Sequence, residues 1–294
     1  MFKTKFRLDP KVLNKDSFYT LNNGVKMPVI GFGTWQVKDG EETYASVKEA
    51  LRVGYRHIDT AEAYKNEESV GRALRDSGLP RADIFVTTKL NNPHTTYEAA
   101  KNAIEASLKR LGLEYVDQYL IHWPNSTHFR PHYQKRNKEV YRAMEDAYFA
   151  GKIRSIGISN FRRHHLEALL ATAKVKPATH QMYINPSDMQ AEVVALNEKY
   201  NILTVAYSPL GTGRLLVLPE LIEIAAKYKK TPAQIALRWS LEHGYLPLAK
   251  SKTPSRIKEN IDIFDFSLSK KDIKILDDLK GKAGLAGDPD TIPF

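Results

Sequence analysis

The sequence predicts an α/β fold, a (β/α)8 TIM barrel preceded by an N-terminal β-hairpin. Three observations predict it: eight short strand-like apolar runs, amphipathic helical segments between them, and 294 residues without a low-complexity linker. Alternating strands and helices indicate a parallel sheet covered by helices, and eight such units over about 250 residues fit a closed barrel. We expect a single domain over residues 1–294, with residues 1–16 as a flexible extension.

The hairpin is predicted by the stretch YTLNNGVKMPVIGFGTW, in which Asn23-Gly24 separates two apolar runs. Both residues of an Asn-Gly turn can take positive φ. Helix starts are indicated by Thr231-Pro232, with Gln234 completing a capping box, and by Thr253-Pro254. The eight expected strands are residues 28–33, 55–59, 84–89, 117–122, 153–158, 178–182, 202–206 and 245–249.

An open, doubly wound sheet is the competing architecture. A dinucleotide-binding sheet of that kind carries G-x-G-x-x-G directly after a strand. Both G-x-G candidates fail, because Gln36 and Leu216 occupy the third glycine position after Gly31-Phe32-Gly33 and Gly211-Thr212-Gly213. The barrel is therefore favoured.

Composition excludes several kinds of site. The chain has no cysteine, so disulfides, thiol nucleophiles and cysteine metal sites are ruled out. Its 42% hydrophobic content favours a large core over disorder. No apolar run is long enough to span a membrane, and the N-terminus lacks the apolar region of a secretory signal. We expect a cytoplasmic protein without a membrane partner.

The formal net charge of +10 favours anionic partners, such as a phosphate-bearing ligand or nucleic acid. Positive charge is in local excess at residues 1–15, 128–138 and 250–258, for which solvated surface is the simplest interpretation. A nucleic-acid binder is not favoured, because the sequence shows no recognition module and no single basic stripe.

Four titratable residues fall at or just after the ends of three successive expected strands: Asp59, Tyr64, Lys89 and His122. Barrel enzymes place their catalytic groups at these ends, although any one such residue is more commonly solvated or capping. An ammonium beside a phenol lowers its pKa, and a shift from about 10 to 7 needs about 4 kcal/mol. In this hypothesis Asp59 keeps Lys89 charged, His122 orients a carbonyl oxygen, and Tyr64 protonates the oxyanion as a hydride reaches carbon. The glutamates of the same segment are expected at the surface or at a helix start.

The stretch GYRHIDTAEAYKNEESVG, residues 54–71, resembles the first signature of the aldo-keto reductase family. Similar stretches are IGFGTW, TTKLNN, YLIHWP, GKIRSIGISNF, AYSPLG and KSKTPSRIKEN, so the resemblance extends from about residue 17 to the C-terminus. It implies a barrel that reduces carbonyl compounds with NADPH, in which Tyr64 is the proton donor, Asp59 and Lys89 tune it, and His122 orients the substrate. It also implies that Trp35 and Trp123 are walls of the substrate pocket.

The resemblance implies NADPH contacts as well: the nicotinamide carboxamide with Ser159, Asn160 and Gln181, and the ring with Tyr207. It places Ser208, Leu210 and Gly211 along the pyrophosphate, and Lys250, Ser251 and Arg256 at the 2′-phosphate. Glu259 and Asn260 lie at the adenine, and the other expected contacts are Gly33, Thr34 and Asp59. The residues themselves support the phosphate site, because Lys250-Ser251 precedes the positive end of an expected helix. The family's usual Ile-Pro-Lys-Ser is Leu248-Ala249-Lys250-Ser251 here, with proline at 247.

The segment after residue 280 is short and rich in Gly and Pro. It resembles microbial members that reduce keto-sugars, small dicarbonyls and aldehydes, such as diketo-gluconate reductases and prostaglandin F synthase-like proteins. We expect a monomer with a small-molecule carbonyl substrate. His128 and His132 have the i, i+4 spacing of a metal-binding pair, but the sequence offers no cysteine and no obvious third ligand, so no metal is expected. The alternative function is a regulatory protein that binds NADPH to sense redox state with little turnover.

Overall fold

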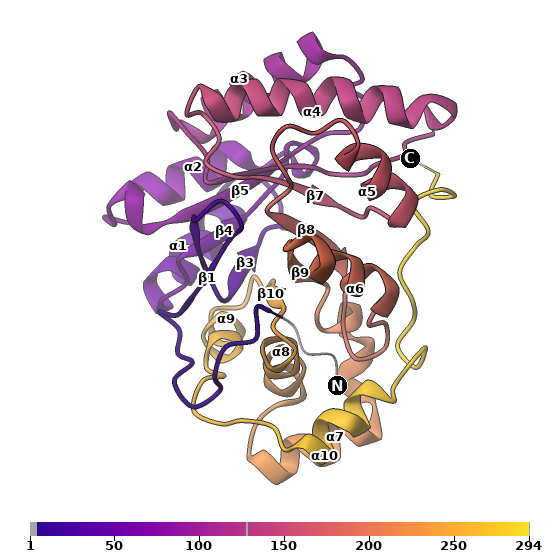
Figure 1. Ribbon diagram of the computed structural model, residues 1–294. Helices are drawn as coiled ribbons and strands as arrows, with labels where there is room; N and C mark the ends of the chain where they lie inside the picture. The colour runs from indigo at the N-terminus through magenta and orange to yellow at the C-terminus, as the bar shows by residue number, and fades with distance from the viewer. Residues whose placement is uncertain (1–4, 128, 294) are drawn as a thin grey trace.

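The computed structural model describes residues 5–127 and 129–293. Its centre is a closed barrel of parallel strands in the order β10-β3-β4-β5-β6-β7-β8-β9, and Figure 1 shows the helices around it. The barrel strands are β3 (Gly31–Gly33), β4 (His57–Asp59), β5 (Phe85–Leu90), β6 (Gln118–Ile121), β7 (Ile156–Ser159), β8 (Thr179–Tyr183), β9 (Leu203–Tyr207) and β10 (Leu246–Ala249). The predicted fold class is confirmed, and each strand begins one to three residues later than expected.

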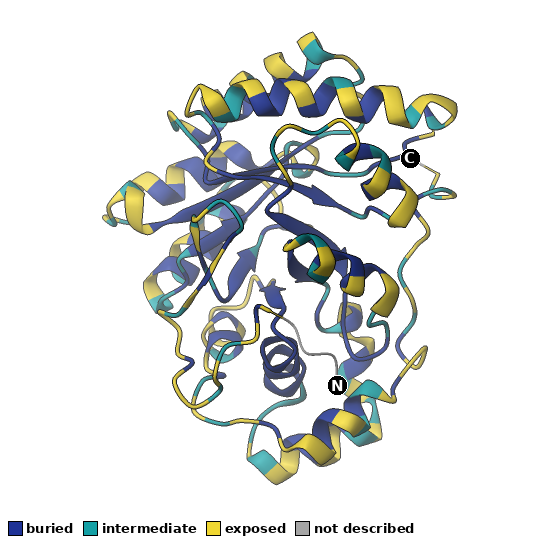
Figure 2. Cartoon of the chain, viewed as in Figure 1, coloured by how far each residue is buried: buried dark blue, intermediate teal, exposed yellow. Residues whose placement is uncertain are grey.

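Most of the helices bury one side and expose the other, whereas α8 is buried almost throughout, as Figure 2 shows. They are α1 (Glu41–Val53), α2 (Glu67–Asp76), α3 (Tyr97–Leu111), α4 (Tyr133–Phe149), α5 (Arg163–Leu170), α6 (Ala191–Tyr200), α7 (Pro219–Tyr228), α8 (Pro232–Glu242), α9 (Pro254–Ile261) and α10 (Lys270–Asp277). Short 3₁₀ helices are η1 (Glu62–Tyr64), η2 (Arg81–Asp83), η3 (Arg130–His132) and η4 (Gly211–Val217). Among the described residues, none of the helices is long and apolar enough to cross a membrane.

Both predicted helix starts are found. The Thr231 hydroxyl accepts from the Gln234 backbone N–H at 3.3 Å, and the Gln234 side chain accepts from the Thr231 N–H at 3.0 Å. This reciprocal capping box begins α8. Helix α9 begins at Pro254 after Thr253, whose side chain makes no capping hydrogen bond.

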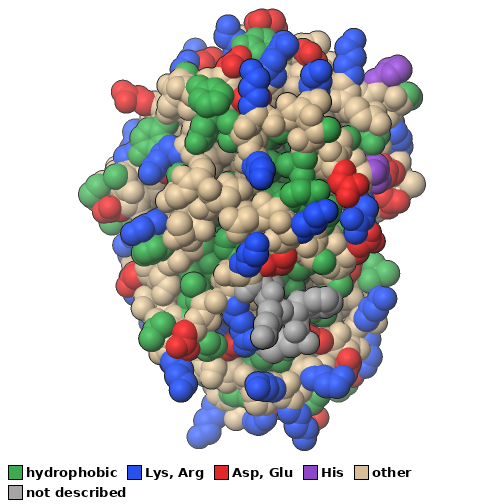
Figure 3. Space-filling model, in the orientation of Figure 1, with side chains coloured by type: hydrophobic (Ala, Val, Ile, Leu, Met, Phe, Trp, Pro, Cys, Tyr) green, Lys and Arg blue, Asp and Glu red, His purple; other side chains and the backbone are tan. Residues whose placement is uncertain are grey.

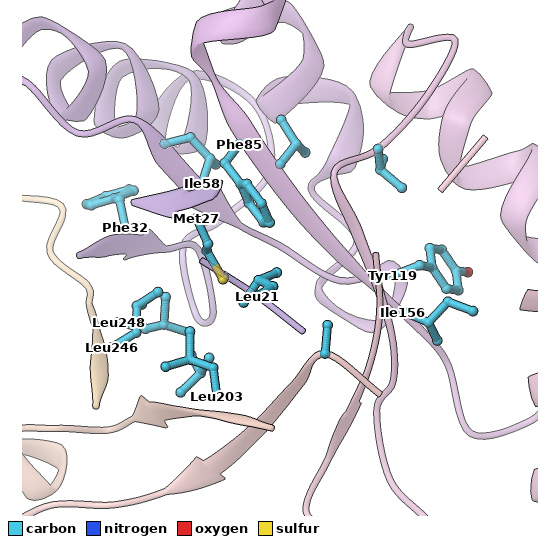
Figure 4. Close-up of a cluster of buried hydrophobic side chains, with 14 of the residues drawn as sticks. Leu21, Met27, Phe32, Ile58, Phe85, Tyr119, Ile156, Leu203, Leu246 and Leu248 are labelled. Atoms are coloured by element: carbon cyan, nitrogen blue, oxygen red, sulfur yellow. The ribbon is translucent and has the colours of Figure 1, made fainter. Parts of the chain in front are cut away.

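The hairpin pairs β1 (Phe18–Thr20) with β2 (Lys26–Pro28) in antiparallel register. Its turn differs from the expectation, because Gly24 has φ +83° whereas Asn23 is outside the left-handed region. The loop is longer than two residues: the Leu21 N–H donates to the Val25 carbonyl, and the Gly24 N–H donates to the Leu21 carbonyl, both at 2.9 Å. Leu21 and Met27 are buried with barrel residues such as Leu248 (Figure 4).

Residues 5–16 pack against the rest of the chain, although a flexible extension over residues 1–16 was expected. Phe6 and Leu13 are each 7% exposed and belong to the hydrophobic core. Arg238 of α8 also donates to the Pro10 carbonyl at 3.5 Å. Apolar side chains in the segment make this packing favourable, and α8 is consequently buried on all sides. Residues 1–4 lie outside the described part of the chain.

Candidate active site

The four predicted catalytic residues come from adjacent elements at the carboxyl-end rim of the barrel. Asp59 is the last residue of β4, and Tyr64 ends the η1 turn that follows it. Lys89 is the next-to-last residue of β5, and His122 directly follows β6. Because β4, β5 and β6 are neighbours in the sheet, these side chains meet at one edge.

Lys89 joins three of these groups. Its ammonium lies 2.6 Å from the Asp59 carboxylate, 2.7 Å from the Thr60 carbonyl and 3.2 Å from the Tyr64 hydroxyl. The side chains of Lys89 and Asp59 are 0% and 4% exposed, so this ion pair is shielded from water. The second Asp59 oxygen accepts from the Gln181 amide at 2.7 Å, which fixes the carboxylate from the other side.

The protonation of Tyr64 differs from the expectation. Burial, followed by the charge of Asp59, raises the pKa of Tyr64 well above its ordinary value. Burial has the larger effect because it penalises the charged phenolate. Asp59 adds to it by offsetting the charge of Lys89, so Lys89 offers the phenol a hydrogen-bond donor but little net field. Tyr64 is therefore a neutral phenol that carries a proton to donate.

Burial acts on both members of the ion pair. It raises the pKa of Asp59 and lowers the pKa of Lys89, while the contact between the two opposes both changes. Either position of the shared proton leaves the pair without net charge. The pair can therefore remain buried beneath Tyr64.

His122 lies beside Tyr64, with ring centroids 5.6 Å apart in an edge-to-face arrangement. Burial and then the charge of Lys89 lower its pKa to about 3. The imidazole is thus neutral near neutral pH, and it can hydrogen-bond a carbonyl oxygen without competing for the proton of Tyr64.

The expected nicotinamide residues lie in or directly after the next strands, β7, β8 and β9. The amide of Asn160 donates to the His122 carbonyl and to the Ser159 hydroxyl, both at 3.0 Å, and its oxygen accepts from the Tyr207 hydroxyl at 2.7 Å. Asn160 has φ +63°, an uncommon conformation that these contacts stabilise. Gln181 belongs to the same group and connects it to Asp59.

A residue that sequence reasoning missed, His180, holds the backbone directly after Asn160. The fully buried imidazole of His180 accepts from the backbone N–H of Phe161 at 3.0 Å. Its other nitrogen lies 2.9 Å from the Asn197 side-chain oxygen, so that nitrogen carries the proton. A lone histidine in a strand gives no sequence signal for this role, because both partners are distant in the chain.

The remaining expected cofactor residues continue around the rim. Thr34 is fully buried and donates to the Asp59 carbonyl at 3.1 Å, next to Gly33 at the end of β3. Ser208 and Gly211 have φ +48° and +56° and flank the half-buried Leu210 before η4. Lys250 and Arg256 are exposed, whereas Ser251 and Asn260 are buried and Glu259 is half-buried.

Lys250 and Arg256 have a feature that suits a phosphate. Within residues 5–127 and 129–293, neither forms an ion pair, whereas their neighbour Lys252 contacts Glu42 at 3.2 Å. Figure 3 shows basic side chains scattered among acidic and apolar ones on the face it presents. The charge of Lys250 and Arg256, which form no ion pair among the described residues, therefore suits a phosphate better than the mixed surface shown in Figure 3 does.

The expected pocket walls, Trp35 and Trp123, are both accessible at the rim: Trp35 is 47% exposed and Trp123 is half-buried. Among the glutamates of that segment, Glu67 begins α2, which meets the expectation of a helix start, and it is only 1% exposed. Its carboxylate accepts from Thr88 at 2.6 Å and from Arg110 at 2.7 Å, which explains the burial.

One cluster has a composition that suits a metal: His164, His165 and Asp290. However, the Nδ1 atom of His165 accepts from the Arg162 backbone N–H at 3.1 Å, so its proton lies on Nε2 and points to Asp290 at 2.9 Å. The ring is thus arranged as a donor to the carboxylate. Of the two histidines considered from sequence, His132 ends η3, and His128 lies outside the described residues.

A closed barrel with a buried polar cluster at its carboxyl-end rim defines a (β/α)8-barrel enzyme. The chain belongs to the aldo/keto reductase family, whose family model matches residues 29–280. It is accordingly an oxidoreductase, and the resemblance expected from the sequence motifs is confirmed.

Individual relatives cover almost the whole chain. Glyoxal reductase of Bacillus subtilis is 44% identical, over 93% of this chain and 96% of its own length. The 9,11-endoperoxide prostaglandin H2 reductase of Trypanosoma cruzi is 41% identical, over 92% of this chain and 94% of its own. A crystal structure of a Bombyx mori aldo-keto reductase in complex with NADP has a TM-score of 0.83 at 33% identity, covering 92% of this chain and 94% of that one.

Proposed function

We propose that the protein is an NADPH-dependent carbonyl reductase that converts aldehydes or ketones to alcohols, with Tyr64 as the proton donor. The observation that carries the proposal is the contact between the Lys89 ammonium and the Tyr64 hydroxyl, with Asp59 behind Lys89. A neutral phenol held at the rim is a suitable acid for an oxygen that gains negative charge.

The chain's residues have separate tasks in this reaction. Bound NADPH would supply the hydride that adds to the carbonyl carbon. As the carbon–oxygen π bond breaks, the oxygen takes the proton of Tyr64, and the phenolate left behind accepts a hydrogen bond from Lys89 until it takes a proton from solvent. The neutral imidazole of His122 hydrogen-bonds the same oxygen and directs it toward Tyr64.

The residues present fit the cofactor. Ser159, Asn160 and Gln181 offer hydroxyl and amide groups suited to a carboxamide, and Tyr207 offers a ring face. Lys250 and Arg256 supply unpaired positive charge next to the N-terminus of α9 for the 2′-phosphate. The NADP complex of the Bombyx mori relative supports the same choice.

The proposed substrates are small dicarbonyls, aldehydes and keto-sugars, in keeping with the glyoxal reductase among the relatives. We propose a monomer, because the residues assigned to the reaction all come from one barrel. The cytoplasmic location expected from the sequence is part of the same proposal.

The test is the absorbance of reduced nicotinamide during turnover with methylglyoxal, a nitrobenzaldehyde and a keto-sugar, using NADPH and NADH in parallel. We expect NADPH oxidation with at least one aldehyde. Tight NADPH binding without turnover of any substrate would contradict the reductase and favour the regulatory function. Failure to bind NADPH would contradict the cofactor assignment.

A further inference from the structure

The η1 turn that carries Tyr64 is held by a second contact, which does not involve the four expected catalytic residues. Glu62, the first residue of η1, accepts from the backbone N–H of Asn91 at 3.2 Å. The Nε2 atom of His94 lies 2.9 and 3.1 Å from its two carboxylate oxygens. We call Glu62, Asn91 and His94 the Glu62 clasp.

The Glu62 clasp lies alongside the contact between Tyr64 and Lys89. Glu62 precedes Tyr64 by two residues, and Asn91 follows Lys89 by two residues. The clasp therefore joins the same two segments, η1 and the end of β5, through a separate set of atoms. These contacts and the Tyr64–Lys89 contact thus restrain the same two segments relative to each other.

The η1 turn depends on such support. It is only three residues long, its middle residue Ala63 and the following Lys65 are exposed, and Lys65 has φ +57°. A single 3₁₀ turn has little stability of its own, because its few hydrogen bonds do not compensate for the ordered backbone. Contacts to the rest of the barrel must therefore fix the turn.

Arg136 of α4 anchors the other side of the clasp. Its side chain is buried, and among the described residues no carboxylate contacts it. The guanidinium instead donates to the His94 carbonyl at 3.0 Å and to the Trp123 carbonyl at 3.3 Å. The loops after β5 and β6, which flank the expected pocket, are thus connected to η1 through His94.

We propose that Glu62 and His94 are positioning residues that set the reach of the Tyr64 phenol toward Lys89 and the substrate oxygen. The inference rests on the proposed function, since it assigns Tyr64 the proton transfer. A displacement of the reacting group by about 1 Å can reduce a rate by about 100-fold. The clasp would thus act on the chemical step and not on cofactor binding, because none of its residues is among the expected NADPH contacts.

The test compares Glu62→Ala, Glu62→Gln, His94→Ala and the double alanine variant by kcat, KM and the Kd for NADPH. Both alanine variants are expected to lower kcat by about tenfold or more, with the NADPH Kd unchanged. Glu62→Gln is expected to retain most of kcat, because an amide oxygen still accepts from Asn91 and His94. The double variant should lose little more than either single variant.

Glu41→Ala is the matched control. Glu41 of α1 pairs with Arg72 of α2 at 3.0 Å, and both side chains are exposed. Removing this surface carboxylate should leave kcat unchanged. Full kcat in folded Glu62→Ala and His94→Ala would overturn the proposal, as would an equal loss in Glu62→Gln and Glu62→Ala.

A second measurement does not depend on turnover. Amide hydrogen exchange of Tyr64 and Lys65 should be faster by about tenfold or more in Glu62→Ala and His94→Ala than in wild type. Unchanged exchange would overturn the clasp even if the wild type reduces no substrate tested. Absence of wild-type turnover with faster exchange in the variants would instead contradict only the proposed function.

Discussion

The Lys89 ammonium lies 3.2 Å from the Tyr64 hydroxyl while it also contacts the buried Asp59 carboxylate at 2.6 Å. This relationship gives Tyr64 a hydrogen-bond donor from a group whose charge is already offset. Burial raises the pKa of Tyr64 most, and Asp59 adds to that effect, so the phenol stays protonated. Lys89 is nevertheless ready as a partner for the phenolate that forms after proton transfer.

The first prediction concerns Lys89→Met. Methionine leaves Asp59 buried without its cation, and breaking a buried ion pair costs about 3–5 kcal/mol of stability. We expect the free energy of unfolding in urea to fall by about that amount and NADPH-dependent turnover to be lost. The double variant Lys89→Met/Asp59→Asn should recover much of the stability but no activity. Recovery of both would show that the pair is structural only.

The second prediction concerns Arg256→Ala. A hydrogen bond to a charged group contributes about 1.5–3 kcal/mol, so the KM for NADPH should rise by about tenfold or more. The KM for NADH, which lacks the 2′-phosphate, should change little. Lys252→Ala is the control, because Lys252 is already paired with Glu42. Equal effects on the two cofactors would refute the phosphate assignment.

The third prediction concerns pH and the fully buried His57. Burial and then the charge of Lys89 lower its pKa from 6.5 to about 3. The unfolded chain therefore binds this proton at a higher pH than the folded chain, and stability falls as the pH drops from 6.5 toward 3. This histidine contributes up to about 1.4 kcal/mol per pH unit to that slope.

Replacing His57 with glutamine, which does not titrate, should make the slope of unfolding free energy against pH shallower between pH 6 and about 4. Denaturant unfolding at several pH values measures this slope, and His132→Gln at an exposed position is the matched control. An unchanged slope in His57→Gln would contradict the assigned protonation.

The barrel and the convergence of Asp59, Lys89 and His122 could be predicted, because they depend on the periodicity of apolar residues and on the order of strands along the chain. Residues at the carboxyl ends of successive parallel strands lie at the same rim of the barrel, independently of the conformation of the loops. Tyr64 follows from Asp59, since only a short turn separates the two.

Features that depend on distances or distant partners could not be predicted. The raised pKa of Tyr64 depends first on its burial and then on the position of Asp59 relative to Lys89. The burial of Glu67 requires Thr88 and Arg110, which come from other elements. In the same way, His180 and the Glu62 clasp have no local sequence signal, because their partners are brought close only by the closed barrel.

The measurement that tests the central claim most directly is a single-turnover reaction of wild type and Tyr64→Phe, each saturated with NADPH before an aldehyde is added. The account predicts that Tyr64→Phe binds NADPH as wild type does and slows the chemical step by about 100-fold or more, since only the acidic hydroxyl is removed. A Tyr64→Phe enzyme that reduces the aldehyde at the wild-type rate would contradict the account, because the proton would then come from another group.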